Sequence, residues 1–181
     1  ENIVSEVKPN FLLSKCYRTD PKTLMFAHGL GMGLFEEKKL RWLSDDQWEA
    51  CGYEIEKIRN DEIYRLKREP LRRFEDLKEH DIQSMNIIKI SKQTSPAVKV
   101  VELIEQLKAE NPTLTADDIG IVFTGGNKSG YSLADILEQL IDAKFGWKLN
   151  KAYESKHKVK NELFISNKNN VKGLEFPFVI C

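Results

Sequence analysis

The amino-acid sequence predicts an α/β fold with a mostly parallel sheet, helices on both faces of that sheet, and a small charged insertion that contains a hairpin. Two observations support the sheet: short apolar runs of strand length recur along the chain, and amphipathic stretches of helix length alternate with them. A third observation is a charge-rich stretch in which two short runs flank a turn. Parallel strands joined by helices are buried on both faces, so continuous apolar runs are typical of them.

The first predicted elements are a short strand at residues 11–13 and a helix that begins after Asp20. Asp20 suits the N-cap of this helix, and Pro21 suits its first position. Four apolar residues at helical spacing predict its buried face, namely Leu24, Met25, Ala27 and Leu30. A run of glycines at residues 29, 31 and 33 predicts that the helix ends there.

The predicted insertion covers residues 36–83. Within it, residues 53–58 and 63–66 flank Asn60 and Asp61, a pair that favours a turn, so we expect a small hairpin. The connector at residues 67–83 carries a high density of both charges, which favours a solvated link. A basic patch that contacts DNA is the alternative interpretation of this connector.

The sequence of the second half of the chain predicts strands that alternate with helices. Strands are expected at residues 87–90, 119–123, 163–165 and 178–180. One helix should begin at Ser95 and Pro96, with Val100, Val101, Ile104 and Leu107 at core spacing. Another should follow a capping box formed by Ser132 and Asp135, with a core face of Leu133, Ile136, Leu137, Leu140 and Ile141.

Composition excludes several classes of protein. The chain has 181 residues, enough for one domain, and its 28 basic and 28 acidic residues leave it without the basic excess of an autonomous nucleic-acid binder. Three cysteines without CxxC spacing and three scattered histidines argue against a disulfide framework and a metal site, and favour a reducing cytoplasm. No apolar run is long enough to span a membrane, and the start at Glu1 without a signal peptide indicates a piece of a longer protein.

A glycine-rich loop at residues 125–130 lies between a predicted strand and a predicted helix, where backbone N–H groups could hold a phosphate. A Walker A loop places Lys and Ser or Thr after its last glycine, whereas Lys128 and Ser129 precede Gly130 here. An ordinary β–α turn is therefore the favoured interpretation, and an isolated nucleotide-binding enzyme that uses this loop is the alternative.

The most informative segment is the polar loop at residues 166–177, which leaves one buried strand and leads into another. A glycine and a carboxylate in such a loop suit the ligand-facing edge of an α/β sheet. Its residues Lys172-Gly173-Leu174-Glu175-Phe176 resemble motif V of UvrD-like superfamily 1 DNA helicases. Residues 13–19, which include Tyr17 and Arg18, resemble motif IV of the same family. The resemblance implies that residues 1–181 form the second RecA-like (2A-type) motor domain, with a P-loop NTPase fold, and that residues 36–83 are an insertion in it.

The resemblance also implies roles for individual residues. Tyr17 would stack on the adenine of ATP, and Arg18 would reach the γ-phosphate as the catalytic residue. Gly173 and Glu175 would lie beside the nucleotide. Single-stranded DNA would contact Lys172 and two asparagines, Asn167 and Asn169, which replace the Thr and His usual in the motif. The Mg²⁺ that accompanies ATP would be held by the first RecA-like domain, which is also the expected protein partner.

The resulting hypothesis is that the chain is part of an ATP-dependent DNA helicase or translocase and is inactive alone, because it holds only one side of the ATP site. It requires Arg18 and Glu175 to lie at the same edge of the sheet. The alternative is a non-catalytic α/β module, derived from a helicase, that binds a protein or a nucleic acid. A Walker A motif upstream and a motif VI arginine downstream would favour the motor.

Overall fold

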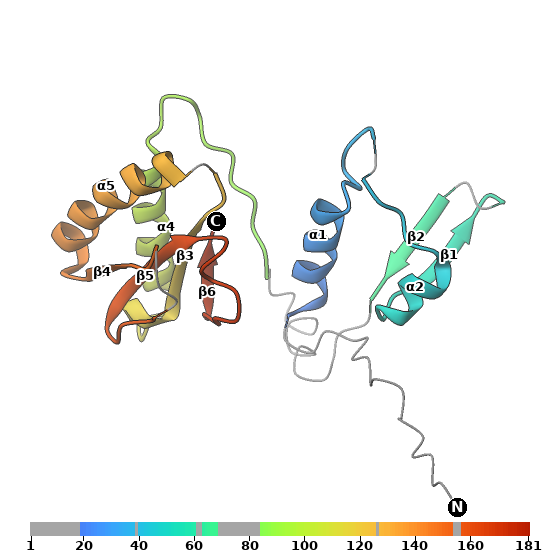
Figure 1. The fold of residues 1–181 in the computed structure, drawn as a ribbon. Coiled ribbons are helices and arrows are strands. Elements are labelled where there is room, and N and C mark those ends of the chain that lie inside the picture. Colours follow the sequence, from blue (N-terminus) through green and yellow to red (C-terminus); the bar gives the residue numbers. More distant parts are fainter. Residues whose placement is uncertain (1–18, 39, 61–62, 69–83, 126, 154–156) are drawn as a thin grey trace, which may run out of the picture. The chain divides into compact units, whose positions relative to one another are not determined.

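The computed structural model describes residues 19–38, 40–60, 63–68, 84–125, 127–153 and 157–181 (Figure 1). The chain divides into two compact units, Glu1–Ile87 and Ile88–Cys181. The predicted strand at residues 11–13 lies outside the described residues, as do Tyr17, Arg18 and most of the connector. The limits predicted for the insertion, 36–83, stay a prediction.

The first unit contains helix α1 (Pro21–Gly31), helix α2 (Asp45–Ala50) and a hairpin of β1 (Glu54–Ile58) and β2 (Ile63–Lys67). The start of α1 is as predicted: the Asp20 carboxylate accepts a hydrogen bond from the N–H of Thr23 at 3.1 Å. The hydroxyl of Ser84 donates to the same carboxylate at 2.7 Å, which ties the end of the unit back to α1.

The buried face of α1 is only partly as predicted. Leu24 and Met25 are half-buried, but Ala27 is exposed and Leu30 is 58% exposed. The helix instead buries Gly29, over which the ring of Phe35 packs. Because glycine has no side chain, the chain after α1 can fold back closely on the helix.

The predicted hairpin is confirmed, with antiparallel pairing from Glu54 opposite Lys67 to Ile58 opposite Ile63. Arg59 and Asn60 begin the turn with φ values of 55° and 52°, in the left-handed region that suits hairpin turns. Helix α2, which the sequence pattern did not predict, begins with a capping box between Ser44 and Gln47.

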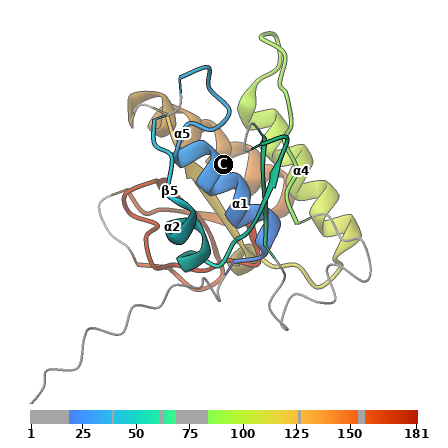
Figure 2. The same cartoon turned by 90° about the vertical axis from the view of Figure 1, so that its right-hand side faces the viewer.

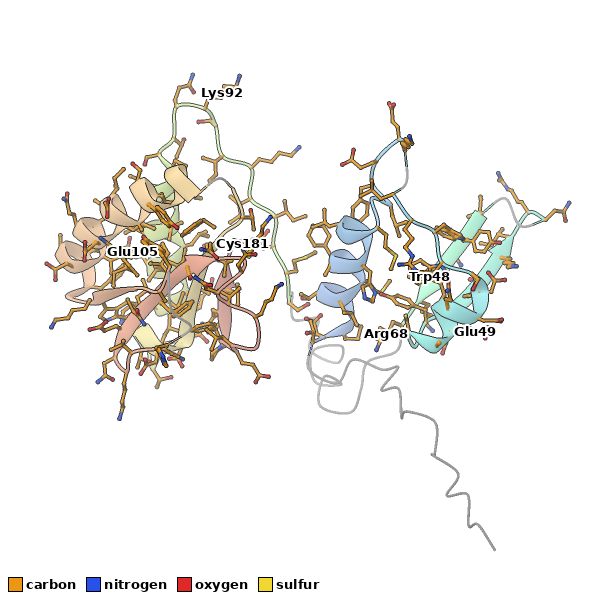
Figure 3. The ribbon with its side chains drawn as sticks, viewed as in Figure 1. Trp48, Glu49, Arg68, Lys92, Glu105 and Cys181 are labelled. Carbon is orange, nitrogen blue, oxygen red and sulfur yellow. The ribbon has the colours of Figure 1, made fainter. Side chains whose placement is uncertain are left out.

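The core of this unit is aromatic and includes a charged residue. Leu43, Trp48 and Tyr53 are buried together. Arg68 is buried against them: it donates to the carbonyl oxygen of Cys51, and its guanidinium lies 5.5 Å from the centre of the Tyr53 ring (Figure 3). The prediction of a solvated connector is therefore wrong for Arg68, because its planar cation finds both a hydrogen-bond acceptor and an aromatic face.

The second unit is built on a parallel sheet in the order β4-β5-β3-β6. Its elements, in chain order, are α4 (Pro96–Glu110), a 3₁₀ turn η2 (Ala116–Asp118), β3 (Ile119–Phe123), α5 (Asn127–Phe145), β4 (Lys148–Lys151), β5 (Glu162–Asn167) and β6 (Phe178–Ile180). This confirms an α/β unit with a mostly parallel sheet. Strand β4 was not predicted, because its sequence Lys-Leu-Asn-Lys is mostly polar at the edge of the sheet.

Both long helices pack against the same face of the sheet. Ile119, Ile121 and Phe123 of β3 share one core with buried residues of α4 and α5. Figures 1 and 2 show the two helices side by side, and an ion pair of 2.8 Å between Glu105 and Lys144 joins them. In the described part of this unit the opposite face bears no helix, so the prediction of helices on both faces is not met here.

Two further predictions about this unit need correction. Residues 87–90, where the second unit begins, form no strand in the structure, and their isoleucines are exposed. Helix α5 begins at Asn127, so Ser132 and Asp135 lie inside the helix and form no capping box. The core faces of the two helices were largely correct, with Val100, Ile104, Leu137 and Ile141 buried and Ile136 exposed.

Candidate functional site

The candidate site lies at the carboxyl edge of the parallel sheet, between β3 and β5. Phe123 and Asn167, the last residues of these strands, are register partners, so the loops that follow them start side by side. The chain leaves β3 into α5 on the helix-covered face. After β5 it crosses the opposite face, where Phe176 packs on Gly120. Ligands of α/β sheets bind in the crevice where neighbouring connections diverge in this way.

Asn167 shapes the loop that follows β5. It is only 8% exposed, and its side-chain oxygen accepts hydrogen bonds from the N–H of Asn169 at 2.9 Å and of Asn170 at 3.2 Å. The side-chain amide of Asn170 donates to the carbonyl oxygen of Tyr153, next to β4. The loop is thus fastened to two strand ends, and the Asn167 oxygen serves the fold.

Asn169 and Lys172 have exposed side chains on the same loop. Of the predicted DNA contacts, these two residues are therefore accessible to a ligand from solvent. An exposed amide and an ammonium group are suited to phosphate and sugar oxygens.

Gly173 adopts a φ of +89°, which a residue with a side chain rarely adopts. A Cβ at this position would meet no atom within 4 Å. Glycine is therefore favoured here by its backbone conformation, not by a lack of space for a side chain. The turn that it completes is closed by a hydrogen bond of 3.1 Å from the N–H of Leu174 to the carbonyl oxygen of Val171. Glu175 follows with its side chain exposed at the surface.

Phe176 anchors the far end of the loop. Its ring lies 5.1 Å from that of Phe164, and the Lys158 ammonium lies 4.6 Å from its centre. A Cβ on Gly120 would approach the Phe176 ring to 2.6 Å, so this contact depends on glycine in β3. The positions of Gly173 and Glu175 are therefore held between two anchors, Asn167 and Phe176.

The loop after β3 is a short β–α turn. Helix α5 starts at Asn127, so Lys128 and Ser129 belong to its first turn and no long phosphate-wrapping loop precedes it. Gly130 has a packing role, because a Cβ there would lie 2.2 Å from the Phe123 ring. These facts favour the ordinary turn over the nucleotide-binding alternative.

An aromatic cluster that sequence reasoning missed lies beside this turn. The rings of Tyr131 and Tyr153 are 4.3 Å apart, and both pack on Phe123. The Tyr153 hydroxyl is buried and has no hydrogen-bond partner among the described residues, and burial raises the pKa of Tyr153. The only sequence signal was aromatic residues near strand ends, and β4 was not predicted.

Lys151, at the end of β4, connects this edge to α5. Its ammonium contacts the carboxylates of Asp135 at 2.8 Å and Glu138 at 2.6 Å. The hydrogen bond to Asp135, followed by that to Glu138, raises the pKa of Lys151. The positive charge of Lys151 is therefore paired with two carboxylates of the same unit.

Among the residues that the structure describes, no group of three or more His, Cys, Asp or Glu side chains is placed to hold a metal ion. No helix within the described ranges is long and apolar enough to cross a membrane. Because Tyr17 and Arg18 lie outside those ranges, their distance from Glu175 stays a prediction.

The second unit is thus an α/β unit with a four-stranded parallel sheet, and the candidate loop, residues 168–177, runs from the carboxyl end of β5 to the start of β6. No protein-family model, curated protein or solved structure matches the chain.

Proposed function

We propose that this chain is part of an ATP-dependent superfamily 1 DNA helicase or translocase, as a second RecA-like motor domain. The observation that carries the proposal is that Lys172-Gly173-Leu174-Glu175-Phe176 lie in the loop that leaves the carboxyl end of β5 and leads into β6 of a parallel sheet. The loop starts at the edge of the sheet where α/β proteins bind nucleotides, and at Phe176 it reaches the amino end of β3.

The exposed loop residues supply one side of two sites in this proposal. Lys172 and Asn169 face solvent and would contact the sugar-phosphate backbone of single-stranded DNA. Glu175 would lie beside the nucleotide, with Tyr17 on its base and Arg18 near its γ-phosphate. The Mg²⁺ that accompanies ATP would be held by residues of the first motor domain.

A single loop would then couple the two sites. Asn167 and Phe176 hold its ends, so a shift of Glu175 on ATP binding would be transmitted to Lys172 only three residues away. In the intact protein, closure of two motor domains around ATP and reopening after hydrolysis would move the enzyme along the strand.

Kinetics of the intact parent protein test the proposal. Arg18→Ala should lower kcat more than it weakens ATP binding, because its cation matters most as charge develops on the γ-phosphoryl group. Tyr17→Ala should mainly raise KM, by about 1–3 kcal/mol of binding if base stacking is comparable to that on other aromatic platforms. Circular dichroism should confirm that both variants fold. A kinetically silent Arg18→Ala would refute the assignment.

DNA binding tests the loop separately. Lys172→Ala should weaken binding of single-stranded DNA and reduce the slope of log affinity against log salt by about one. Lys92→Ala is the matched control, because Lys92 is an exposed lysine of the same unit in the segment that precedes α4, outside the loop at residues 168–177 (Figure 3). Equal effects of the two substitutions would favour nonspecific attraction over a loop site.

The isolated chain should show no DNA-stimulated ATP hydrolysis with Mg²⁺. Robust turnover that is lost on Arg18→Ala would instead show a complete active site within these residues.

A further inference from the structure

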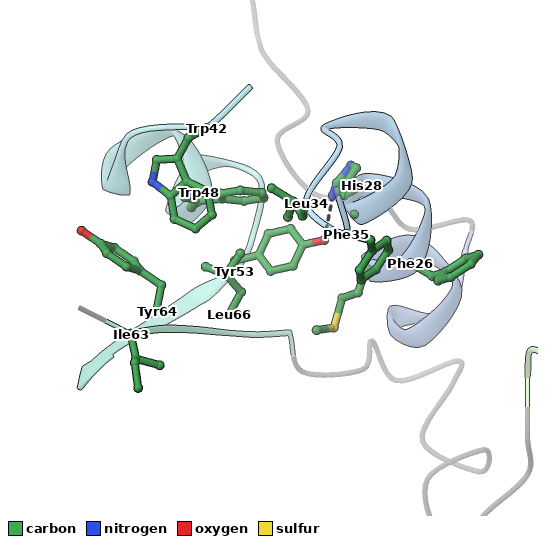
Figure 4. Close-up of a pocket in the computed structure, with 12 residues that line it drawn as sticks. Phe26, His28, Leu34, Phe35, Trp42, Trp48, Tyr53, Ile63, Tyr64 and Leu66 are labelled. Atoms are coloured by element: carbon green, nitrogen blue, oxygen red, sulfur yellow. Dashed lines mark hydrogen bonds between the residues drawn. The ribbon is translucent and has the colours of Figure 1, made fainter. Parts of the chain in front are cut away.

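The first unit contains an aromatic pocket, separate from the loop site, of about 660 Å³. Six aromatic residues define it: Phe26, Phe35, Trp42, Trp48, Tyr53 and Tyr64 (Figure 4). Aliphatic side chains complete its walls. The few polar groups among these residues are largely at the tips of aromatic rings, so the interior suits an apolar group.

The walls of the aromatic pocket are held in place by side-chain contacts. Trp42 meets Trp48 and Tyr64 edge to face, with ring centres 5.6 Å and 5.2 Å apart. On the opposite wall, Nδ1 of His28 and the hydroxyl of Tyr53 share a hydrogen bond of 2.7 Å. Such packing fixes rotamers before a ligand arrives, which reduces the entropy lost on binding.

The rim of the pocket leaves large apolar side chains in contact with solvent. Phe35 is 66% exposed, Ile63 is 44% exposed and Trp42 is 41% exposed. Exposed apolar residues that gather around one hollow are typical of surfaces that bind a partner. Here they come from three separate segments of the unit.

A second recess of about 450 Å³ adjoins the pocket and is acidic. It shares Trp42 and Tyr64 with the aromatic pocket and adds the carboxylates of Asp45 and Asp46. Asp45 is paired with Lys57 at 2.6 Å, whereas exposed Asp46 makes no ion pair with the described residues. The Lys57 ammonium also lies 5.3 Å from the centre of the Tyr64 ring, so Lys57 already neutralises Asp45 and covers Tyr64, and Asp46 is the carboxylate left for a basic ligand.

We propose that these two recesses form a docking surface for a peptide segment of a partner protein, in which a bulky apolar side chain is followed closely by a lysine or arginine. The apolar side chain occupies the aromatic pocket. The basic group lies against Trp42 and pairs with Asp46.

The charge of the second recess favours a basic peptide over a nucleic acid. Aromatic rings would also stack with an unpaired base. However, a strand whose base entered the pocket beside Trp42 would bring its phosphates near the carboxylate of Asp46, and like charges repel. The docking surface lies within the first unit, and peptide binding there does not depend on the proposed helicase function.

Selection from a random peptide library displayed on phage, with the full 181-residue chain as bait, tests the proposal. We expect enrichment of peptides that combine a large apolar residue with a nearby basic residue. The best peptide is then labelled with fluorescein, and its affinity is measured by fluorescence anisotropy. Enrichment of acidic peptides, or of none, would overturn the proposal.

Substitutions locate the binding site. Phe35→Ala and Asp46→Lys should each lower the affinity for the labelled peptide about tenfold or more. Because the Phe35 ring also packs on Gly29, circular dichroism should confirm that Phe35→Ala stays folded, and Asp46→Lys tests the site without removing an apolar contact. The matched controls are Ile136→Ala, an exposed apolar residue on α5, and Glu49→Lys, an exposed acid on α2 outside both recesses (Figure 3). Equal losses in the controls would contradict the proposed site.

A single-stranded oligonucleotide tests the competing ligand. It should not displace the labelled peptide, and its own binding should not change with Phe35→Ala. Displacement together with dependence on Phe35 would assign the pocket to nucleic acid and overturn the peptide proposal.

Discussion

The side-chain oxygen of Asn167 accepts a hydrogen bond of 2.9 Å from the backbone N–H of Asn169, so the last residue of β5 shapes the loop that follows it. The same oxygen accepts from Asn170 at 3.2 Å. A buried side chain thus determines where the exposed residues of the loop lie.

Asn167→Ala should therefore destabilise the second unit by about 1–3 kcal/mol, because it removes the buried acceptor of two hydrogen bonds from loop N–H groups. Asn167→Asp keeps an acceptor oxygen and should therefore reduce the stability of the unit less than Asn167→Ala does. Urea denaturation measures the free energy of unfolding, and hydrogen exchange of the Asn169 and Asn170 amides reports on the loop itself. Lys168→Ala, an exposed neighbour, is the control, and an equal loss there would contradict a specific role for Asn167.

Gly130→Ala should destabilise the second unit by about 1–3 kcal/mol, since the added methyl group overlaps the Phe123 ring. Phe123→Leu should relieve part of this clash, so the double variant should lose less than the sum of the single losses. Gly31→Ala is the control, because a Cβ there would meet nothing within 4 Å. Additive losses at Gly130 and Phe123 would show that the packing contact is not responsible.

Acid should destabilise the first unit below neutral pH. Burial, and secondarily the Arg68 cation, lower the pKa of His28 from its ordinary value of 6.5. The unfolded chain therefore takes up the proton first, so the stabilisation is complete above about pH 6.5 and declines as the pH falls toward the folded-state pKa. Urea denaturation between pH 7.5 and 5.5 should show that the free energy of unfolding decreases as the pH falls, and His28→Gln should remove most of this dependence. An unchanged dependence would refute the contribution of His28.

Arg68→Met should raise the pKa of His28, because it removes a nearby positive charge. An NMR titration of the imidazole measures the shift. Arg65→Met is the control: Arg65 is exposed on the same hairpin and is paired with Glu56 at 2.8 Å. If both substitutions shifted the pKa equally, the effect would reflect overall charge and not the buried Arg68.

Local sequence patterns predicted those helices and strands whose conformation depends on residues close together in the sequence. Asp20 and Pro21 predicted the start of α1, and the apolar run at residues 119–123 predicted β3. The same reasoning failed for residues 87–90, where an apolar run is exposed and forms no strand. It also missed β4, whose polar side chains are tolerated at the edge of the sheet.

The candidate site was predicted in part. Gly173 was expected to lie beside a nucleotide, which stays a prediction, whereas its positive φ was not predicted. Nothing in the pattern distinguished Asn167 from Asn169. One side chain is buried and holds the loop while the other is exposed, and this difference arises from where β5 ends in the sheet.

The sequence by itself determined the local conformations, because caps, turn residues and apolar periodicity act between residues a few positions apart. The tertiary structure alone decided which strands are neighbours, that α4 and α5 share one face, and that Arg68 is buried against Tyr53. These outcomes depend on contacts between residues distant in sequence, whose energies exist only after the chain has folded and excluded water from between them.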